Sequence, residues 1–241
     1  MRYLALASDY DGTLAHDSHV SEEALAAIRR LKDSGRKVIL VTGREMPELQ
    51  SVFPDYKICD AIVAENGALL VWPGEDREEV LGEPPPEAFL TEIVHRGVKP
   101  FSVGRVVFAT WRPHEAAVLD AIQTLGIEYH IIFNKRAVMV LPSGINKATG
   151  LAKALKRMKI APANVVGIGD AENDHAFLES CAVAAAVENA LPSLKERCDV
   201  ILDRDHGGGV IDLIDRVLAD DLQSLGVRRP RKDIVTQTVK A

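Results

Sequence analysis

The sequence has 241 residues, of which 47% are hydrophobic and 27% charged, and its formal net charge at pH 7 is −6. This composition is that of an ordinary soluble globular protein, which excludes disordered, collagen-like and disulfide-scaffold classes, and the acidic balance argues against a nucleic-acid-binding role. Because no stretch approaches the roughly 18 uncharged apolar residues of a membrane helix, and the first residues form too short an apolar run for a signal peptide, we expect a cytoplasmic protein without membrane contact.

Short apolar runs alternate with helical patterns along most of the chain, which is typical of βα units and a mostly parallel sheet. The runs lack strict alternation, as expected of strands that are covered on both faces. They predict strands at Tyr3–Ser8, Lys37–Val41, Ala61–Ala64, Val165–Ile168, Cys181–Ala185 and Val200–Leu202. Helices are predicted at 21–34, 46–52, 146–158, 173–179 and 209–219. We therefore expect an α/β fold, a Rossmann-like parallel-sheet core with helices on both faces.

The middle of the chain follows a different pattern. Two short runs, at 68–72 and 79–81, flank a Pro73-Gly74 turn, and three prolines at 84–86 then break the chain. The order that follows is helix (87–96), strand (105–110), helix (114–125) and two strands (128–133 and 137–141). This predicts a smaller α+β domain at 82–143, inserted into a core formed by 1–81 and 144–221. Residues 222–241 contain five basic residues and one acidic residue, and they are interpreted as a basic tail or linker.

Two carboxylates follow the first predicted strand, in the segment Asp9-Tyr10-Asp11-Gly12-Thr13. Ligands of open parallel sheets bind at this carboxyl edge. Because Asp9 and Asp11 would repel one another, their proximity favours a cation such as Mg²⁺, which prefers oxygen ligands. A carboxylate can attack phosphorus while a second one moves protons. The alternative is a turn in which the aspartates cap a helix.

Further polar residues occur at the same predicted edge. Thr42-Gly43 follows the second strand, where the hydroxyl could bind a phosphoryl oxygen or merely cap a helix. Lys147 opens a predicted helix, which is unfavourable for the helix dipole unless an anion lies nearby; an exposed lysine is the alternative. Asp170 and Asp174 form a second acidic cluster that could face a cation, or could cap the following helix.

These four signals, in this order, closely resemble the haloacid dehalogenase superfamily of phosphohydrolases. Its motifs are DxDGT, a Thr or Ser after the second strand, a Lys, and GDxxND, and this sequence matches all four. The resemblance spans residues 3 to about 220. The position of the insert implies a C2-type cap, as in the Cof-like sugar phosphatases.

The resemblance implies a role for each matching residue. Asp9 would be the nucleophile and Asp11 the general acid/base, while Thr42, Gly43 and Lys147 would hold the phosphoryl group. Mg²⁺ would be bound by Asp9, Asp11 (through its backbone carbonyl), Asp170 and Asp174. Substrate contacts are expected from Asn66 and Asn173, and also from Trp111 and Arg112, because these two follow a predicted strand of the insert. Other polar residues of the insert are further candidates, namely Arg105, His114, Asn134, Lys135 and Arg136.

The implied function is that of a Mg²⁺-dependent phosphatase. It would hydrolyse a small phosphorylated metabolite, either a sugar phosphate or a phosphorylated organic acid such as phosphoglycolate, through an aspartyl-phosphate. Two alternatives stay open. The chain could be a phosphohexomutase of the C2-capped type, or a non-catalytic regulatory module of a larger protein joined through its basic tail.

Overall fold

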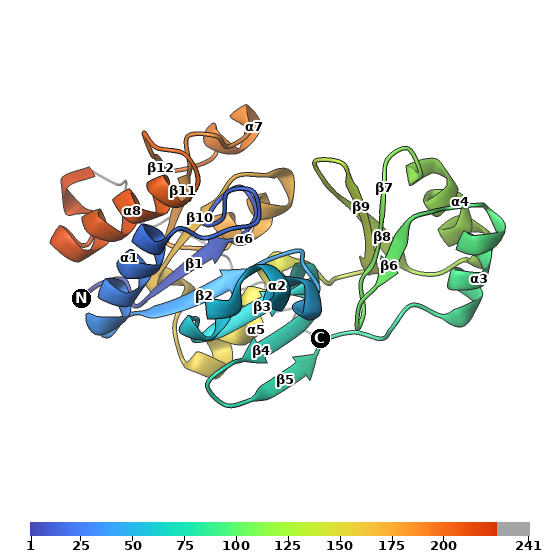
Figure 1. Cartoon of the computed structure of the whole chain (residues 1–241), viewed down its shortest axis with the longest axis horizontal. Coiled ribbons are helices and arrows are strands. Elements are labelled where there is room, and N and C mark those ends of the chain that lie inside the picture. Colours follow the sequence, from blue (N-terminus) through green and yellow to red (C-terminus); the bar gives the residue numbers. More distant parts are fainter. Residues whose placement is uncertain (226–241) are drawn as a thin grey trace, which may run out of the picture.

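The computed structural model describes residues 1–225, and Figure 1 shows them as two lobes. The larger lobe is built around an eight-stranded sheet, and the smaller one around a four-stranded sheet. Most of the predicted basic tail, residues 226–241, lies outside the described residues. Within residues 1–225, no helix is long and apolar enough to cross a membrane.

The large sheet confirms the predicted α/β fold. Its strands lie in the order β12-β11-β10-β1-β2-β3-β4-β5, and the first six of these are parallel. They are β1 (Ala5–Asp9), β2 (Lys37–Val41), β3 (Ala61–Ala64), β10 (Val165–Gly169), β11 (Val183–Ala186) and β12 (Val200–Ile201). The antiparallel strands β4 (Leu69–Trp72) and β5 (Arg77–Val80) extend the sheet at one edge. The strand order reverses at β1, which lies between β2 and β10, so a crevice opens at its carboxyl end.

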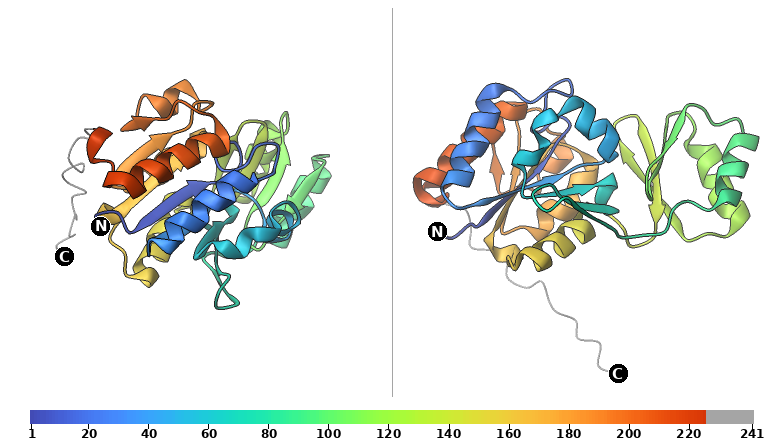
Figure 2. Two further views of the ribbon diagram at one scale, coloured as in Figure 1. Left: turned by 60° about the vertical axis from the view of Figure 1, so that its left-hand side comes forward. Right: turned by 60° about the horizontal axis from the view of Figure 1, so that its bottom comes forward.

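Helices cover both faces of the parallel part of this sheet, so β1, β3, β10 and β11 are buried along their whole length. Helices α1 (Glu22–Asp33) and α8 (His206–Asp220) lie on one face, while α5 (Lys147–Met158) and α6 (His175–Ser180) lie on the other (Figure 2). The remaining helices of the lobe are α2 (Met46–Val52) and α7 (Pro192–Lys195). Helix α1 begins as predicted, with the Ser21 side chain accepting a hydrogen bond from the N–H of Ala24. Short 3₁₀ turns occur at Pro54–Ile58, Glu65–Gly67, Pro162–Asn164, Glu172–Asp174 and Gln223–Leu225.

The smaller lobe, which we call the cap lobe, consists of residues 87–142. Its antiparallel strands lie in the order β6-β7-β9-β8. They are β6 (Phe101–Val103), β7 (Phe108–Trp111), β8 (Tyr129–Asn134) and β9 (Ala137–Pro142). Helices α3 (Glu87–His95) and α4 (Glu115–Leu125) pack on the outer face of this sheet, and its other face is turned toward the large lobe (Figure 1). An α+β insert is therefore present, and the boundaries 82 and 143 stay a prediction.

Several predicted elements differ from those of the structure. The strand predicted from residue 105 begins at Phe108, because residues 104–107 form a turn held by the large lobe. The helix predicted from residue 173 begins at His175, after a 3₁₀ turn that contains Asp174. Helix α8 begins at His206, so the glycines at 207–209 lie inside it. No local pattern predicts β6 or the one-turn helix α7.

Candidate active site

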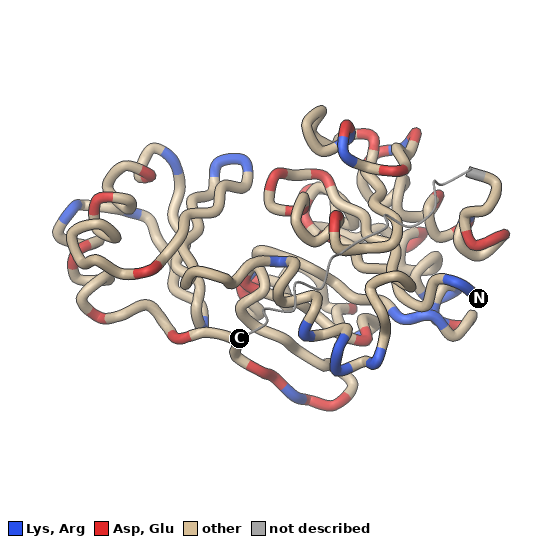
Figure 3. The backbone as a smooth tube through the Cα atoms, turned by 180° about the vertical axis from the view of Figure 1, so that it is seen from behind, with Lys and Arg blue, Asp and Glu red and all other residues tan. Residues whose placement is uncertain are grey.

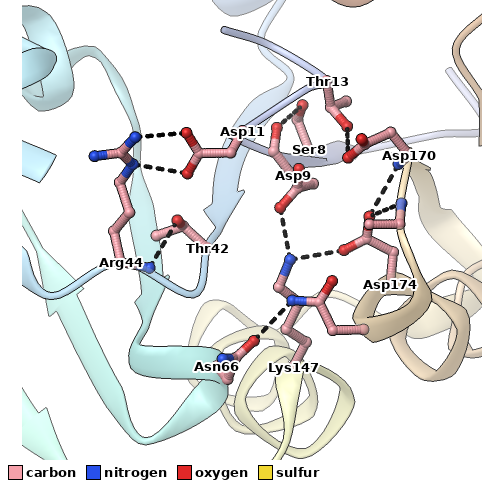
Figure 4. A network of polar contacts seen from close by, with 12 residues as sticks. Ser8, Asp9, Asp11, Thr13, Thr42, Arg44, Asn66, Lys147, Asp170 and Asp174 are labelled. Carbon is pink, nitrogen blue, oxygen red and sulfur yellow. Dashed lines mark hydrogen bonds and ion pairs between the residues drawn. The ribbon is translucent and has the colours of Figure 1, made fainter. Parts of the chain in front are cut away.

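The predicted site residues meet at the carboxyl edge of the large sheet. Asp9 ends β1, Thr42 follows β2, Asp170 follows β10, and Lys147 begins α5. Figure 4 shows Lys147 between Asp9 and Asp174 with Asp170 beside them, whereas the Thr42 hydroxyl is turned toward the backbone of Arg44. The parallel arrangement of β2, β1 and β10 is what places these residues together, since each strand ends at the same edge.

Lys147 lies at the centre of this group. Its ammonium nitrogen Nζ donates hydrogen bonds to Asp9 Oδ1 and to Asp174 Oδ1, both at 2.6 Å, and its side chain is 1% exposed. Burial by itself would lower the pKa of Lys147, but the Asp174 and Asp9 carboxylates outweigh burial and raise it above the ordinary value. The lysine therefore stays charged, and the alternative of an exposed lysine is wrong.

Asp174 orients the loop that follows β10. Its second oxygen, Oδ2, accepts hydrogen bonds from the backbone N–H groups of Asp170 at 2.9 Å and Ala171 at 3.0 Å. Asp170 in turn accepts a hydrogen bond from the Thr13 hydroxyl on Oδ1 at 3.2 Å. Asp174 thus fixes the loop after β10 and contacts Lys147, but its side chain makes no capping hydrogen bond to α6, the helix that follows. Its predicted role as a ligand of a metal ion stays a prediction.

Three buried carboxylates form a possible metal site. Each of Asp9, Asp170 and Asp174 offers one oxygen, and these atoms lie within 4.8 Å of one another. Burial raises the pKa of Asp9, and the charge of Asp174 raises it further, although Lys147 acts in the opposite direction. Burial and Asp174 also raise the pKa of Asp170. A divalent cation would offset this crowding of negative charge, and an all-oxygen donor set fits Mg²⁺.

Because residue 12 is a glycine, the loop after β1 can lie close to the Asp170 carboxylate. The φ of Gly12, +87°, lies in the left-handed region, and a Cβ atom at this position would approach Asp170 Oδ2 to 2.4 Å. A larger residue at position 12 would therefore displace the Asp170 carboxylate.

The Asp11 carboxylate lies outside this cluster and faces Arg44, a residue that the sequence patterns do not single out. Arg44 donates through Nε and Nη2 to the two oxygens of Asp11, each at 2.7 Å, in a bidentate pair. It also donates to Ser18 Oγ at 2.7 Å and to Glu48 Oε1 at 2.5 Å. The only local signal for Arg44 is its place directly after the Thr42-Gly43 pair.

Thr42 and Gly43 form the loop that links these groups. Thr42 is fully buried, and its hydroxyl oxygen accepts the backbone N–H of Arg44 at 3.1 Å. The backbone N–H of Asn66 donates to the Thr42 carbonyl at 3.0 Å. The loop is thereby fixed against the turn between β3 and β4. Because the Thr42 hydroxyl oxygen accepts the hydrogen bond from Arg44, the Thr42 hydroxyl proton is not used in that bond.

A cleft of about 610 Å³ separates the two lobes at this site. Asp9, Asp11 and Gly43 line it from the large lobe. Its lining from the cap lobe includes Trp111, Asn134, Lys135, Arg136 and Met139. The acidic groups at the end of β1 thus face a space that a small molecule could enter between the lobes.

The structure places the four residues predicted to contact the substrate in three different environments. Asn66 and Asn173 are hydrogen-bonded to each other, with Nδ2 of Asn173 donating to Oδ1 of Asn66 at 3.0 Å. The Trp111 side chain is 53% exposed and lines the cleft. Arg112 is absent from the described lining of the cleft, and its guanidinium carbon lies 5.1 Å from the centroid of the Phe133 ring. The structure therefore brings Trp111 to the cleft and leaves Arg112 outside it.

Comparison with known proteins gives concordant results. The profile of a family described as haloacid dehalogenase-like hydrolase matches residues 6–95 and 129–214. Phosphoglycolate phosphatase of Methanothermobacter thermautotrophicus is 32% identical over 225 residues, which are 89% of this chain and 98% of that protein. Phosphoglycolate phosphatase 2 of Saccharolobus solfataricus is 28% identical over 222 residues, 90% of this chain and 93% of that protein.

A solved structure supports the fold. A haloacid dehalogenase-like hydrolase from Bacteroides thetaiotaomicron superimposes with a TM-score of 0.75 at 17% sequence identity. The match covers 90% of this chain and all of that one. At this level of identity, the likeness concerns the arrangement of the two lobes and not the substrate.

Proposed function

This chain belongs to the haloacid dehalogenase-like hydrolases and is a phosphoric monoester hydrolase, and we propose that its substrate is a small phosphorylated organic acid, with 2-phosphoglycolate as the leading candidate. The substrate class is supported by the names of the two relatives. The chemistry is supported by one observation above all, namely that a buried, charged lysine holds Asp9 and Asp174 beside Asp170.

In the proposed reaction, Asp9 attacks the phosphorus atom. A bond forms between a carboxylate oxygen of Asp9 and phosphorus, while the bond from phosphorus to the leaving-group oxygen breaks. Asp11 gives a proton to that oxygen, which leaves as an alcohol. Water then attacks the aspartyl-phosphate, Asp11 takes its proton, and inorganic phosphate departs with Asp9 restored.

The remaining site residues would bind the phosphoryl group. The Thr42 hydroxyl and the Lys147 ammonium would donate to the phosphoryl oxygens, and both are held in place by the contacts described above. The carboxylates of Asp9 and Asp170 would hold Mg²⁺, with Asp174 beside them and the Asp11 backbone carbonyl as a further ligand. When bound, the ion would offset negative charge on the phosphoryl oxygens.

A panel of phosphomonoesters tests this function. Purified protein would be incubated with 2-phosphoglycolate, hexose phosphates and nucleoside monophosphates, with Mg²⁺ or with excess chelator, and inorganic phosphate would be measured. We expect Mg²⁺-dependent release, fastest from 2-phosphoglycolate. Equal release in chelator would contradict the metal assignment. Conversion of a hexose 1-phosphate into its isomer without phosphate release would replace hydrolysis by the mutase reaction.

A further inference from the structure

A lysine at the tip of the cap lobe reaches across the cleft to the acidic cluster. Asn134 pairs with Ala137 at the end of the hairpin formed by β8 and β9, so the turn between them consists of Lys135 and Arg136. In Figure 3 this basic turn faces an acidic stretch of the large lobe. The Lys135 ammonium nitrogen lies 3.1 Å from Asp170 Oδ2. It would also lie 2.8 Å from a Cβ atom placed on Gly12, so it is positioned over the loop that follows Asp9.

The backbone conformation of residue 135 does not favour a lysine. Lys135 has a φ of +54°, in the left-handed region. Two-residue hairpin turns with such a conformation favour glycine, asparagine or aspartate, because a larger side chain is strained there. The β8–β9 hairpin thus carries a residue that costs conformational energy and that delivers a positive charge into the cleft.

The other cations beside the cluster are already held. Arg44 forms a bidentate pair with Asp11, and Lys147 is fully buried between Asp9 and Asp174. Lys135 differs from both of them. Its side chain is 56% exposed, and within residues 1–225 its one ion pair is the contact with Asp170. A single contact at the end of a flexible, hydrated side chain is easily exchanged for another anion.

Asp170 has a second use in the proposed function, as a ligand of Mg²⁺. A divalent cation and the Lys135 ammonium would both draw on the negative charge of the same carboxylate, so the two compete. When the cation holds Asp170, the ammonium loses its partner but stays at the mouth of the site. At this position it faces the side of the cleft from which the leaving group of a substrate bound at Asp9 would extend.

We propose that Lys135 is the specificity-determining residue of the cap lobe: its ammonium binds an anionic group on the leaving-group side of the substrate, such as the carboxylate of 2-phosphoglycolate, and releases Asp170 when Mg²⁺ binds. This inference rests on the proposed function. It makes two predictions of opposite sign, since loss of the ammonium weakens substrate binding and strengthens metal binding. A residue with a merely structural role would weaken both.

The test uses Lys135→Asn, because asparagine removes the charge and tolerates the left-handed backbone of the turn. The kcat/KM of this variant would be measured on 2-phosphoglycolate and on 2-hydroxyethyl phosphate, an analogue of similar size in which a neutral alcohol replaces the carboxylate. We expect a loss of about tenfold or more on 2-phosphoglycolate, as for the removal of one charge-assisted hydrogen bond, and little change on the neutral analogue. Lys135→Arg should keep most of the preference for the carboxylate.

Binding of Mg²⁺ supplies a readout that does not depend on turnover. Titration calorimetry with MgCl₂ on chelator-treated protein should show tighter binding to Lys135→Asn than to the wild type. Lys153→Met is the matched control, since it removes an exposed lysine charge from α5, and it should change neither measurement. Equal losses on both esters, no loss on either, or unchanged or weaker Mg²⁺ binding would overturn the inference. If the wild type cleaves neither ester, the proposed substrate class fails, and the Mg²⁺ titration still decides the competition.

Discussion

The Glu65 carboxylate of the large lobe accepts a hydrogen bond from the backbone N–H of Val106 in the cap lobe, at 2.9 Å. The same carboxylate accepts the N–H groups of Arg105 at 2.9 Å and Val107 at 3.0 Å, and Glu65 is 1% exposed. A Cβ atom at Gly104 would come within 2.7 Å of this carboxylate, so only a glycine allows the turn to approach so closely. One end of the cap-lobe sheet is therefore anchored to the large lobe, while the other end touches it through Lys135.

This anchor predicts a local effect of Glu65→Ala. Three backbone N–H groups would lose their partner, and an unsatisfied buried donor costs about 1–3 kcal/mol. Hydrogen exchange measured by NMR or mass spectrometry should accelerate at residues 105–107. Amides in α3 and α4 serve as the internal control, because Glu65 does not contact these helices. Unchanged exchange at 105–107 would show that the carboxylate does not hold the turn.

Substitution of Lys147 should reduce both stability and activity. Lys147→Met leaves Asp9 and Asp174 buried without their cation, and breaking a buried ion pair in this way costs about 3–5 kcal/mol. Urea unfolding in chelator should report a loss of this order, and Mg²⁺ should restore part of it. Phosphate release should fall below detection. Lys153→Met, on the exposed side of the same helix, should behave as the wild type in both assays.

The two candidate residues at the end of β7 should differ in their effect on substrate binding. Trp111 lines the cleft, whereas Arg112 stacks on Phe133 outside it. Steady-state kinetics of Trp111→Ala should show a raised KM or an altered ranking of substrates, with unchanged Mg²⁺ affinity. Arg112→Ala should leave KM close to the wild-type value. The reverse result would mean that the cap lobe presents a different surface to the substrate.

The free energy of unfolding at alkaline pH should depend on the buried thiol of Cys59. Burial raises the pKa of the Cys59 thiol from 9.0 to about 12, so the folded protein holds this proton more tightly than the unfolded chain does. The contribution of Cys59 to the free energy of unfolding is therefore complete below about pH 9 and falls by about 1.4 kcal/mol per pH unit above it.

Urea unfolding of the wild type and Cys59→Ala, at several pH values between about 8 and 10.5, isolates this contribution. The stability difference between the two proteins should shrink as the pH rises above about 9. Because every other titrating group is common to both proteins, a constant difference would show that the Cys59 thiol is not protected from ionisation.

The sequence predicts the parallel part of the large sheet well, because each of its six parallel strands corresponds to a short apolar run. The runs Lys37–Val41, which is apolar after its first residue, and Ala61–Ala64, which is apolar throughout, form strands with the predicted bounds, and only Lys37 of these residues is exposed. The three-residue strand Phe101–Val103 has exposed side chains and follows a proline, so it becomes a strand only by pairing with β7. Residues 105–107 resemble a strand in sequence, but their N–H groups are used by Glu65.

In the candidate site, too, some residues are marked by the local sequence and others are defined only by long-range contacts. Asp9, Thr42, Lys147 and Asp170 could be predicted because each follows or precedes a recognisable element. The pair formed by Arg44 and Asp11 joins residues 33 positions apart, and the anchor between Glu65 and Arg105 joins residues 40 positions apart. No local pattern marks such partners, because their roles arise only when the strands and the two lobes are brought together.

Phosphate release by Asp9→Asn is the most direct test of the proposed chemistry. Asparagine has nearly the size of aspartate and can still accept the hydrogen bond from Lys147, but its amide is a poor nucleophile toward phosphorus. With 2-phosphoglycolate and Mg²⁺, we predict that the wild type releases inorganic phosphate and that the folded variant releases none above background. Release by the variant at the wild-type rate would contradict the assignment of Asp9 as the nucleophile and, with it, the aspartyl-phosphate mechanism.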